Sequence, residues 1–285
     1  MPKTYNELYL DARRQLKHCE IEAASLEARE LLCYAAGKDR NQFYADAQLY
    51  ANDGVEERLQ ELLERRLDGE PTAYLIGEWE FYGLTLDVNR DVLIPRSDTE
   101  VIAEWAIEIA KQAGEGCRVL DLCTGSGCIG LAVASQVPNA RVVLADINEQ
   151  ALHIARINTR RNGLNRQVMC MQADALQEPR GMTGMFDLIV SNPPYIRSGD
   201  LPGLDRSVRD FEPMLALDGG DDGLMFYHSI AEKWKLALKP GGTLLFEVGY
   251  DQADDVEQIL AHQGYQEIDS RMDTQNIWRA VQGKC

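Results

Sequence analysis

The chain has 285 residues, a formal net charge of −17, and 45% hydrophobic and 26% charged residues. This length and composition are typical of a globular protein with about two domains. The acidic excess argues against a nucleic-acid backbone as the main partner, because such binding depends on clustered Lys and Arg. No apolar run approaches the roughly 18 residues that span a bilayer, and the polar start lacks the apolar core of a signal peptide. We therefore expect a cytoplasmic protein that does not bind membranes.

The seven cysteines are scattered and contain no C-x-x-C pair, which argues against a disulfide framework and against a zinc ribbon. Cys123 and Cys128 are the closest pair and lie in a glycine-rich turn without a nearby histidine. We interpret both as buried thiols and expect no metal site.

Apolar residues recur at helical spacing through the first 75 or so residues, and Gly37 provides a helix stop. The repeating positions include Leu8, Ala12, Leu16, Ala28, Leu31, Leu32, Leu59, Leu62 and Leu63. This pattern predicts an N-terminal helical domain over residues 1–75. It contains no catalytic constellation, so it serves either as a docking surface for a partner or as a structural cap.

Residues 76–96 alternate between apolar and polar side chains around Gly83, which predicts a β-hairpin linker. Ser97 and Glu100 then have the S-x-x-E spacing of a helix capping box. We place the start of a second, larger domain there, over residues 97–285.

A strand, a glycine-rich turn and a helix of small residues follow one another between residues 117 and 134. Gly125 and Gly127 provide the G-x-G of a nucleotide cradle, and the pattern G-x-G-x-x-G is complete only if Gly130 counts. The next strand ends in Asp146, about twenty residues on, where an acid binds ribose hydroxyls. This order of strand, glycine turn, helix, strand and acid fits both a dinucleotide-dependent dehydrogenase and a methyltransferase with a nucleoside cofactor.

Strands and helices continue to alternate toward the C-terminus, which predicts an α/β domain of about seven strands. Asp174 follows the third strand and either accepts from an adenine amine or caps a turn. An irregular stretch from Ser198 to Gly223 is long enough to be a functional loop or lid.

The strongest site signal is the run from Phe186 to Tyr195, where a buried strand stops at Asn192, Pro193 and Pro194. The prolines remove two N–H donors and favour extended backbone, so the Asn192 side-chain oxygen and the Pro193 carbonyl are free to act as acceptors. Two acceptors side by side suit a planar NH2 group, and Tyr195 is placed to cover its face. The same run also fits a strand that ends in a simple Pro-Pro turn.

Several motifs together resemble a known family. Asp121-Leu122-x-Thr124-Gly125-Ser126-Gly127, Asp146 and Ser191-Asn192-Pro193-Pro194-Tyr195 are similar to motifs of class I methyltransferases that modify planar nitrogens. Further motifs extend the resemblance to the peptide chain release factor glutamine N5-methyltransferases over nearly the whole chain. They are Phe81-Tyr82-Gly83, Leu93-Ile94-Pro95-Arg96-Ser97-Asp98-Thr99-Glu100, Phe211-Glu212-Pro213 with Ala216-Leu217, Gly219-Gly220-x-Asp222-Gly223-Leu224, and Glu247-x-Gly249.

The resemblance implies a Rossmann-like, seven-stranded class I methyltransferase domain, preceded by the helical domain and the hairpin. It also implies the cofactor S-adenosyl-L-methionine and, as substrate, the glutamine of the Gly-Gly-Gln motif of release factors. The implied catalytic residues are Asn192, Pro193, Pro194 and Tyr195. The implied cofactor-binding residues are Cys123, Thr124, Gly125, Ser126, Gly127, Asp146, Asp174, Ala175 and Asn192.

Three positions depart from the family pattern. Cys123 replaces a usual glycine, Ala175 replaces a residue that is aromatic in many members, and Gln275 interrupts the expected D-x-x-G-x-x-R. None of these changes removes an implied catalytic group.

Methyl transfer to an amide requires neither a metal nor a general base in the binding step. Acceptors that hold both N–H bonds stabilise the positive charge that develops on nitrogen.

Other functions also fit the Asn192 loop. A nucleic-acid amino methyltransferase would use the same loop, with a base-flipping pocket in basic surroundings. A methyltransferase that modifies a glutamine of a ribosomal protein would differ mainly in how it docks its substrate. A non-enzymatic nucleotide-binding module is the remaining alternative.

Overall fold

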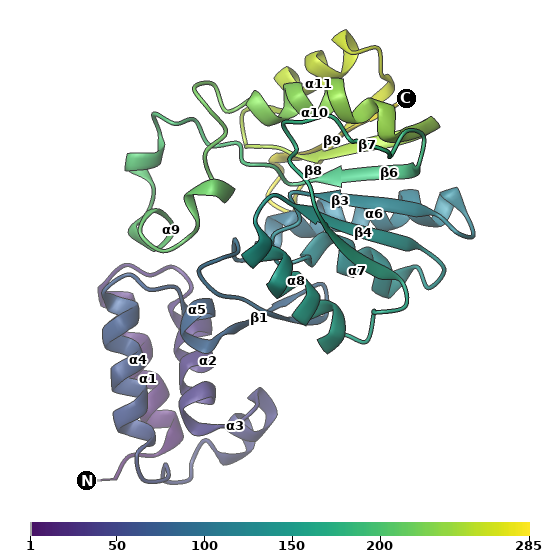
Figure 1. Ribbon diagram of the computed structural model, residues 1–285. Helices are drawn as coiled ribbons and strands as arrows, with labels where there is room; N and C mark the ends of the chain where they lie inside the picture. Colours follow the sequence, from purple (N-terminus) through teal and green to yellow (C-terminus); the bar gives the residue numbers. More distant parts are fainter. Residues whose placement is uncertain (1) are drawn as a thin grey trace. The chain divides into compact units, whose positions relative to one another are not determined.

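The computed structural model describes residues 2–285, which form two compact units. The first unit contains the residues up to Glu78 and the segment Asp205–Phe211, and the second contains Trp79–Leu204 and Glu212–Cys285. The division into a helical domain over 1–75, a hairpin linker over 76–96 and a larger domain over 97–285 remains a prediction. Figure 1 shows the elements of both units.

The first unit is a helical bundle, as the apolar spacing predicted. Its helices are α1 (Tyr5–His18), α2 (Ala24–Ala36), α3 (Arg40–Asp46), α4 (Val55–Leu67) and α5 (Thr72–Ile76). The repeating apolar residues are buried in one core, among them Leu16 and Leu31. Gly37 ends α2 with a φ of 63°, a conformation that glycine adopts without steric cost.

The segment 205–211 belongs to this unit although it is distant in the sequence. It contains the short helix α9 (Arg206–Arg209). Arg206 forms an ion pair of 3.0 Å with Asp68, and a side chain at Gly69 would press within 3.3 Å of Arg206 and Phe211. The sequence carries no periodic signal for this packing.

The predicted hairpin is present as β1 (Glu78–Phe81) and β2 (Leu84–Asp87), which form a two-stranded sheet. Its two-residue turn places Tyr82 at φ 50° and Gly83 at φ 74°, as a type I′ turn requires. The predicted capping box is wrong. Residues Ser97–Thr99 form the 3-10 helix η1. The next helix, α6 (Glu100–Ala113), follows Thr99, whose side chain does not cap it. The side chain of Glu100 accepts from the amide of Tyr82 instead of from the backbone at Ser97.

The second unit contains a seven-stranded sheet in the order β5-β4-β3-β6-β7-β9-β8. Its strands are β3 (Arg118–Leu122), β4 (Arg141–Asp146), β5 (Val168–Gln172), β6 (Phe186–Ser191), β7 (Leu238–Glu247), β8 (Gln266–Met272) and β9 (Trp278–Lys284). The five strands from β5 to β7 are parallel, and β9 is antiparallel to both of its neighbours. This confirms the predicted Rossmann-like fold of a class I methyltransferase.

Helices cover both faces of this sheet (Figure 1). One layer comprises α6 (Glu100–Ala113), α7 (Cys128–Gln136) and α8 (Glu149–Arg161), and the other comprises α10 (Met225–Lys233), η4 (Trp234–Ala237) and α11 (Ala253–His262). Side chains of β6 alternate between the two layers, with Leu188 in the first core and Ile189 in the second. Burial on both faces explains why this strand is an unbroken apolar run.

Two short 3-10 helices, η2 (Leu201–Gly203) and η3 (Met214–Ala216), lie in the long stretch after β6. Strand β7 is irregular, because Leu238 pairs with Phe186 while Thr243 pairs with Leu188. None of the helices formed by residues 2–285 is long and apolar enough to cross a bilayer.

Candidate active site

A pocket lies where β3, β4, β5 and β6 end. The carboxyl ends of parallel strands meet at one edge of a sheet, which is where open α/β folds bind ligands. The predicted site residues that line this pocket are Cys123, Thr124, Gly125, Ser126, Asp146, Asp174, Ala175, Asn192 and Pro194. Within the part of the chain that the structure describes, Gly127, Pro193 and Tyr195 are not in the lining.

The carboxylate of Asp146 is bound to the glycine turn. One oxygen accepts from the amide of Gly125 over 2.9 Å and the other from the amide of Asn148 over 2.9 Å. Burial raises the pKa of Asp146 and these backbone amides oppose the rise. Since each carboxylate oxygen accepts more than one hydrogen bond, both retain capacity for ligand hydroxyls.

Asp121 fixes the turn from below. Its buried carboxylate accepts from the hydroxyl of Thr124 over 2.6 Å and from the amide of Gly130 over 2.8 Å. Burial raises the pKa of Asp121 to about 7. A side-chain carbon at Gly130 would lie 2.3 Å from Leu144, so this glycine permits close packing of α7 on the sheet.

Cys123 has a left-handed backbone with a φ of 62°, which explains why a glycine is usual at this position. Contrary to our expectation of buried thiols, Cys123 and Cys128 are only partly buried, and both line the pocket. Burial nevertheless raises the pKa of both thiols, so they stay protonated and weakly reactive. Among residues 2–285 no group of His, Cys, Asp or Glu side chains is arranged to hold a metal ion.

The cofactor turn and the Asn192 loop start from adjacent strand ends. Leu122 of β3 pairs with Ser191 of β6, and the Ser191 hydroxyl donates to the Leu122 carbonyl over 2.7 Å. This hydrogen bond joins the two loops at their bases, so Thr124 and Asn192 line the same pocket.

Asp174 and Ala175, which follow β5, form a further part of the pocket wall. Asp174 accepts from the amide of Leu176 over 2.8 Å, which is the turn-capping role that we considered, although its side chain also lines the pocket. The carbonyl of Ala175 accepts from Ser229 over 3.2 Å and from Trp234 over 3.1 Å, so this wall is anchored to the helical layer of α10.

Tyr195 is not in this lining, and its hydroxyl lies near a buried acid. Its hydroxyl lies 3.4 Å from an oxygen of Glu247, whose side chain is buried at the end of β7. Burial raises the pKa of Glu247 to about 7, with the hydroxyl of Thr99 and the charge of Arg279 opposing the rise. The other Glu247 oxygen has no hydrogen-bond partner among the described residues.

Arg279 is held beside this acid by two carboxylates. It forms ion pairs with Asp98 at 3.2 Å and with Asp273 at 2.9 Å. Our reading of Gln275 as the interruption in D-x-x-G-x-x-R was wrong: counted from Asp273, the glycine position is occupied by Asn276. Its φ of 61° is left-handed, and Asn tolerates this conformation better than most residues.

Two further walls of the pocket come from segments that we did not assign to the site. One contains Asp91, Val92, Leu93, Pro95, Arg96 and Thr99, and the other contains Pro213, Leu215 and Ala216. Buried Glu212 joins these walls, because it accepts from the amide of Ile94 and forms an ion pair with Arg96. The family motifs around Arg96 and Glu212 were the available sequence signal.

Comparison with known proteins agrees with this geometry. The PrmC N-terminal domain family matches residues 7–77, and the family described as methyltransferase small domain matches residues 106–203. A release factor glutamine methyltransferase of Geobacter sulfurreducens is 40% identical, over 93% of this chain and 90% of that protein. A release factor glutamine methyltransferase of Clostridium acetobutylicum is 35% identical, over 93% of both chains.

A solved methyltransferase structure from Pyrococcus furiosus is 20% identical with a TM-score of 0.51, over 71% of this chain and 89% of that one. At this identity the likeness shows the fold alone. The two bacterial relatives show more, because their identity extends over nearly the full length. On that basis, together with the glycine turn, Asp146 and the Asn192 loop around one pocket, the chain belongs to the release factor glutamine methyltransferase family.

Proposed function

We propose that this protein transfers the methyl group of S-adenosyl-L-methionine to the side-chain amide nitrogen of the glutamine in the Gly-Gly-Gln motif of peptide chain release factors. One observation carries the proposal. A single pocket is lined both by the glycine turn with Asp146 and by Asn192 and Pro194. A cofactor cradle and an amide-binding loop therefore face a common space.

The residues present fit S-adenosyl-L-methionine. Open space lies beside Gly125, because a side-chain carbon there would meet nothing within 4 Å, and Ile147 and Leu176 offer apolar surface to a base. Asp146 would accept from the ribose hydroxyls, Asp174 and Ala175 would line the adenine, and the turn Cys123–Gly127 would run beneath the methionine end. When bound, the cofactor supplies an electrophilic methyl group.

Asn192 and Pro193 would hold the substrate amide. The Asn192 side-chain oxygen and the Pro193 carbonyl are acceptors for the two amide hydrogens, and they stabilise the positive charge that grows on nitrogen. Pro194 shapes the loop and Tyr195 supports it. By orienting the amide nitrogen toward the transferable methyl group, these residues would supply much of the remaining rate enhancement.

A protein substrate suits this chain. The net charge of −17 disfavours approach of a polyanion, so neither nucleic acid nor a membrane is an expected partner. A glutamine that reaches the pocket must lie on an exposed loop, and the flanking glycines allow close backbone approach. Release factors act in the cytoplasm, where we place this enzyme.

The test is incubation of the protein and methyl-labelled S-adenosyl-L-methionine with five acceptors in parallel. They are a release factor, its Gln→Ala variant at the Gly-Gly-Gln motif, ribosomal protein, DNA and RNA. We expect label on the release factor alone and loss of label in the Gln→Ala variant. Label on nucleic acid, or label that persists on the variant, would overturn the substrate assignment. Label on ribosomal protein alone would also overturn it and would identify a glutamine of that protein as the methyl acceptor.

A further inference from the structure

Gln252 is a buried polar residue that lies outside the pocket and that the sequence did not single out. It immediately precedes α11, but its side chain does not cap that helix. Only 2% of its surface is exposed. A long amide buried at a helix start, where short capping side chains are preferred, serves something other than the helix.

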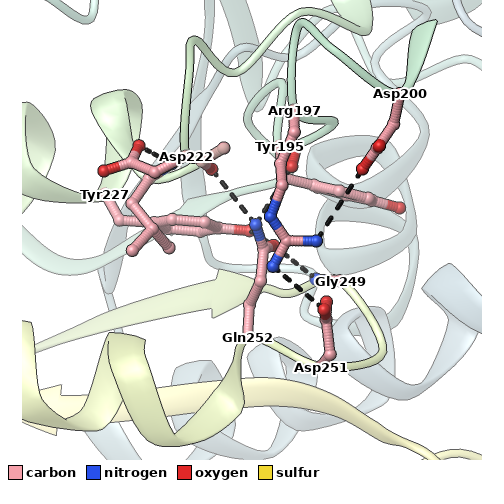
Figure 2. Close-up of polar contacts among 10 residues, drawn as sticks. Tyr195, Arg197, Asp200, Asp222, Tyr227, Gly249, Asp251 and Gln252 are labelled. Atoms are coloured by element: carbon pink, nitrogen blue, oxygen red, sulfur yellow. Dashed lines mark hydrogen bonds and ion pairs between the residues drawn. The ribbon is translucent and has the colours of Figure 1, made fainter.

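The side chain of Gln252 joins three segments of the chain (Figure 2). Its NH2 group donates to the carbonyl of Tyr195 over 3.0 Å and to the carbonyl of Gly223 over 3.3 Å. Its oxygen accepts from the amide of Gly249 over 3.0 Å, and it lies 3.5 Å from the hydroxyl of Tyr227, which also donates to the carbonyl of Glu247 over 3.0 Å. Two carbonyls can only accept and an amide N–H can only donate, so the orientation of this side chain is fixed.

Gly219 and Gly223 pack closely against the backbone of Tyr195. A side-chain carbon at Gly219 would lie 2.7 Å from the Cα of Tyr195, and one at Gly223 would lie 2.4 Å from the Tyr195 carbonyl oxygen and 2.6 Å from the Gln252 nitrogen. Hydrogen bonds from Ile196 to Leu217 and from Gly219 to Ile196 tie the two segments further. The residue after the two prolines is therefore enclosed on several sides.

We propose that Gln252 is a positioning residue for methyl transfer. By holding the Tyr195 carbonyl, it fixes the end of the Asn192–Tyr195 loop and with it the direction of the Asn192 and Pro193 acceptors. This inference rests on the proposed function. Acceptors that stabilise a developing charge must be preorganised, and a displacement of about 1 Å can cost about a hundredfold in rate.

A second link between these segments lies at the surface. Arg197 forms an ion pair of 2.9 Å with Asp251, as Figure 2 also shows. Both side chains are more than one third exposed, and exposed ion pairs contribute little to stability. The buried amide is thus the stronger link between the loop and the start of α11.

The test compares Gln252→Glu and Gln252→Met with Gln258→Glu, a control at an exposed position of α11. Gln252→Glu keeps the acceptor for Gly249 and loses both donors, and Gln252→Met loses all of the hydrogen bonds without adding charge. We measure single-turnover transfer to release factor at saturating cofactor, KM for release factor, cofactor affinity by calorimetry, and amide hydrogen exchange.

We expect the transfer rate to fall at least about tenfold in both Gln252 variants, with KM and cofactor affinity within about threefold of the parent. Amides of Ile196 and Ser198 should exchange faster, while those of β3 stay protected. Parent-like transfer in either folded Gln252 variant would overturn the inference, as would an equal rise in exchange throughout the second unit. If the parent itself fails to methylate release factor, the proposed function fails instead. The loop-exchange result then still decides whether Gln252 positions the loop.

Discussion

The hydroxyl of partly buried Tyr195 donates over 3.4 Å to an oxygen of Glu247, whose side chain is buried at the end of β7. Burial raises the pKa of Glu247 from its ordinary 4.5 to about 7. The folded protein therefore retains this proton at pH values where the unfolded chain has lost it.

Glu247→Gln should reduce the pH dependence of stability. Between about pH 4.5 and pH 7 the folded state binds more protons at Glu247 than the unfolded state does, so the free energy of unfolding falls as pH rises. The contribution of Glu247 is on the order of 3 kcal/mol at most, and Asp121 adds a fall of the same sign. Chemical denaturation at pH 5 and pH 8 should give a smaller difference in the variant. Glu61→Gln, at an exposed position, is the control. If the difference in unfolding free energy between pH 5 and pH 8 is the same in Glu247→Gln as in the parent, Glu247 does not cause this pH dependence.

Asn192→Ala should slow methyl transfer far more than it affects folding. The side chain is only partly buried and lines the pocket, so its loss removes little packing. Loss of one preorganised acceptor commonly costs about a hundredfold or more in turnover. Single-turnover kinetics at saturating cofactor measures this, with thermal unfolding as the check on folding. Transfer near the parent rate would mean that the loop has only a structural role.

Asp146→Ala should weaken S-adenosyl-L-methionine binding by about 1–3 kcal/mol, as expected for loss of hydrogen bonds to a charged acceptor. The substitution also leaves the amide of Gly125 without the hydrogen bond that it donates to Asp146 in the parent protein. Asp146→Asn retains one acceptor oxygen and should lose less. Titration calorimetry distinguishes these cases. Equal affinities in all three proteins would remove Asp146 from the cofactor site, and tighter binding of NAD would favour the dehydrogenase alternative.

Cys123→Gly should be more stable than Cys123→Ala by about 1 kcal/mol, because a left-handed conformation strains any residue that carries a side-chain carbon. The φ of 62° at this position is the observation behind the prediction. Both variants remove the sulfur, so their difference reports the effect of the side-chain carbon at this position and not the effect of the thiol. Denaturant midpoints at constant m-value provide the measurement, and a less stable glycine variant would show that the turn is not strained.

The sequence was sufficient to predict the order of strands and helices, because burial on both faces makes runs such as residues 186–191 unmistakable. The hairpin was predictable from its alternation of apolar and polar residues, and the N-terminal helices from the helical spacing of their apolar residues. The placement of the glycine turn and of Asn192 at one sheet edge follows from parallel topology. The roles of those residues stay predictions.

Other features could not be predicted, because they depend on long-range packing. The capping-box pattern at Ser97 failed since Glu100 is used by Tyr82 of the hairpin instead. Pro240-Gly241-Gly242 has the composition of a turn, but these residues lie within the irregular strand β7. Gln252 is a single polar residue beside a helical pattern, and the groups around its side chain come from three separate stretches of the chain, at Tyr195, at Gly223 and at Gly249.

The hydrogen bond from Ser191 to Leu122 has a consequence for how the two loops are spaced. It joins strand ends that are 69 positions apart in the sequence, on strands that pair in register at these same two residues. The separation between the glycine turn and the Asn192 loop is therefore set by the sheet, at the point where both loops begin, and does not depend on contacts between the loop tips.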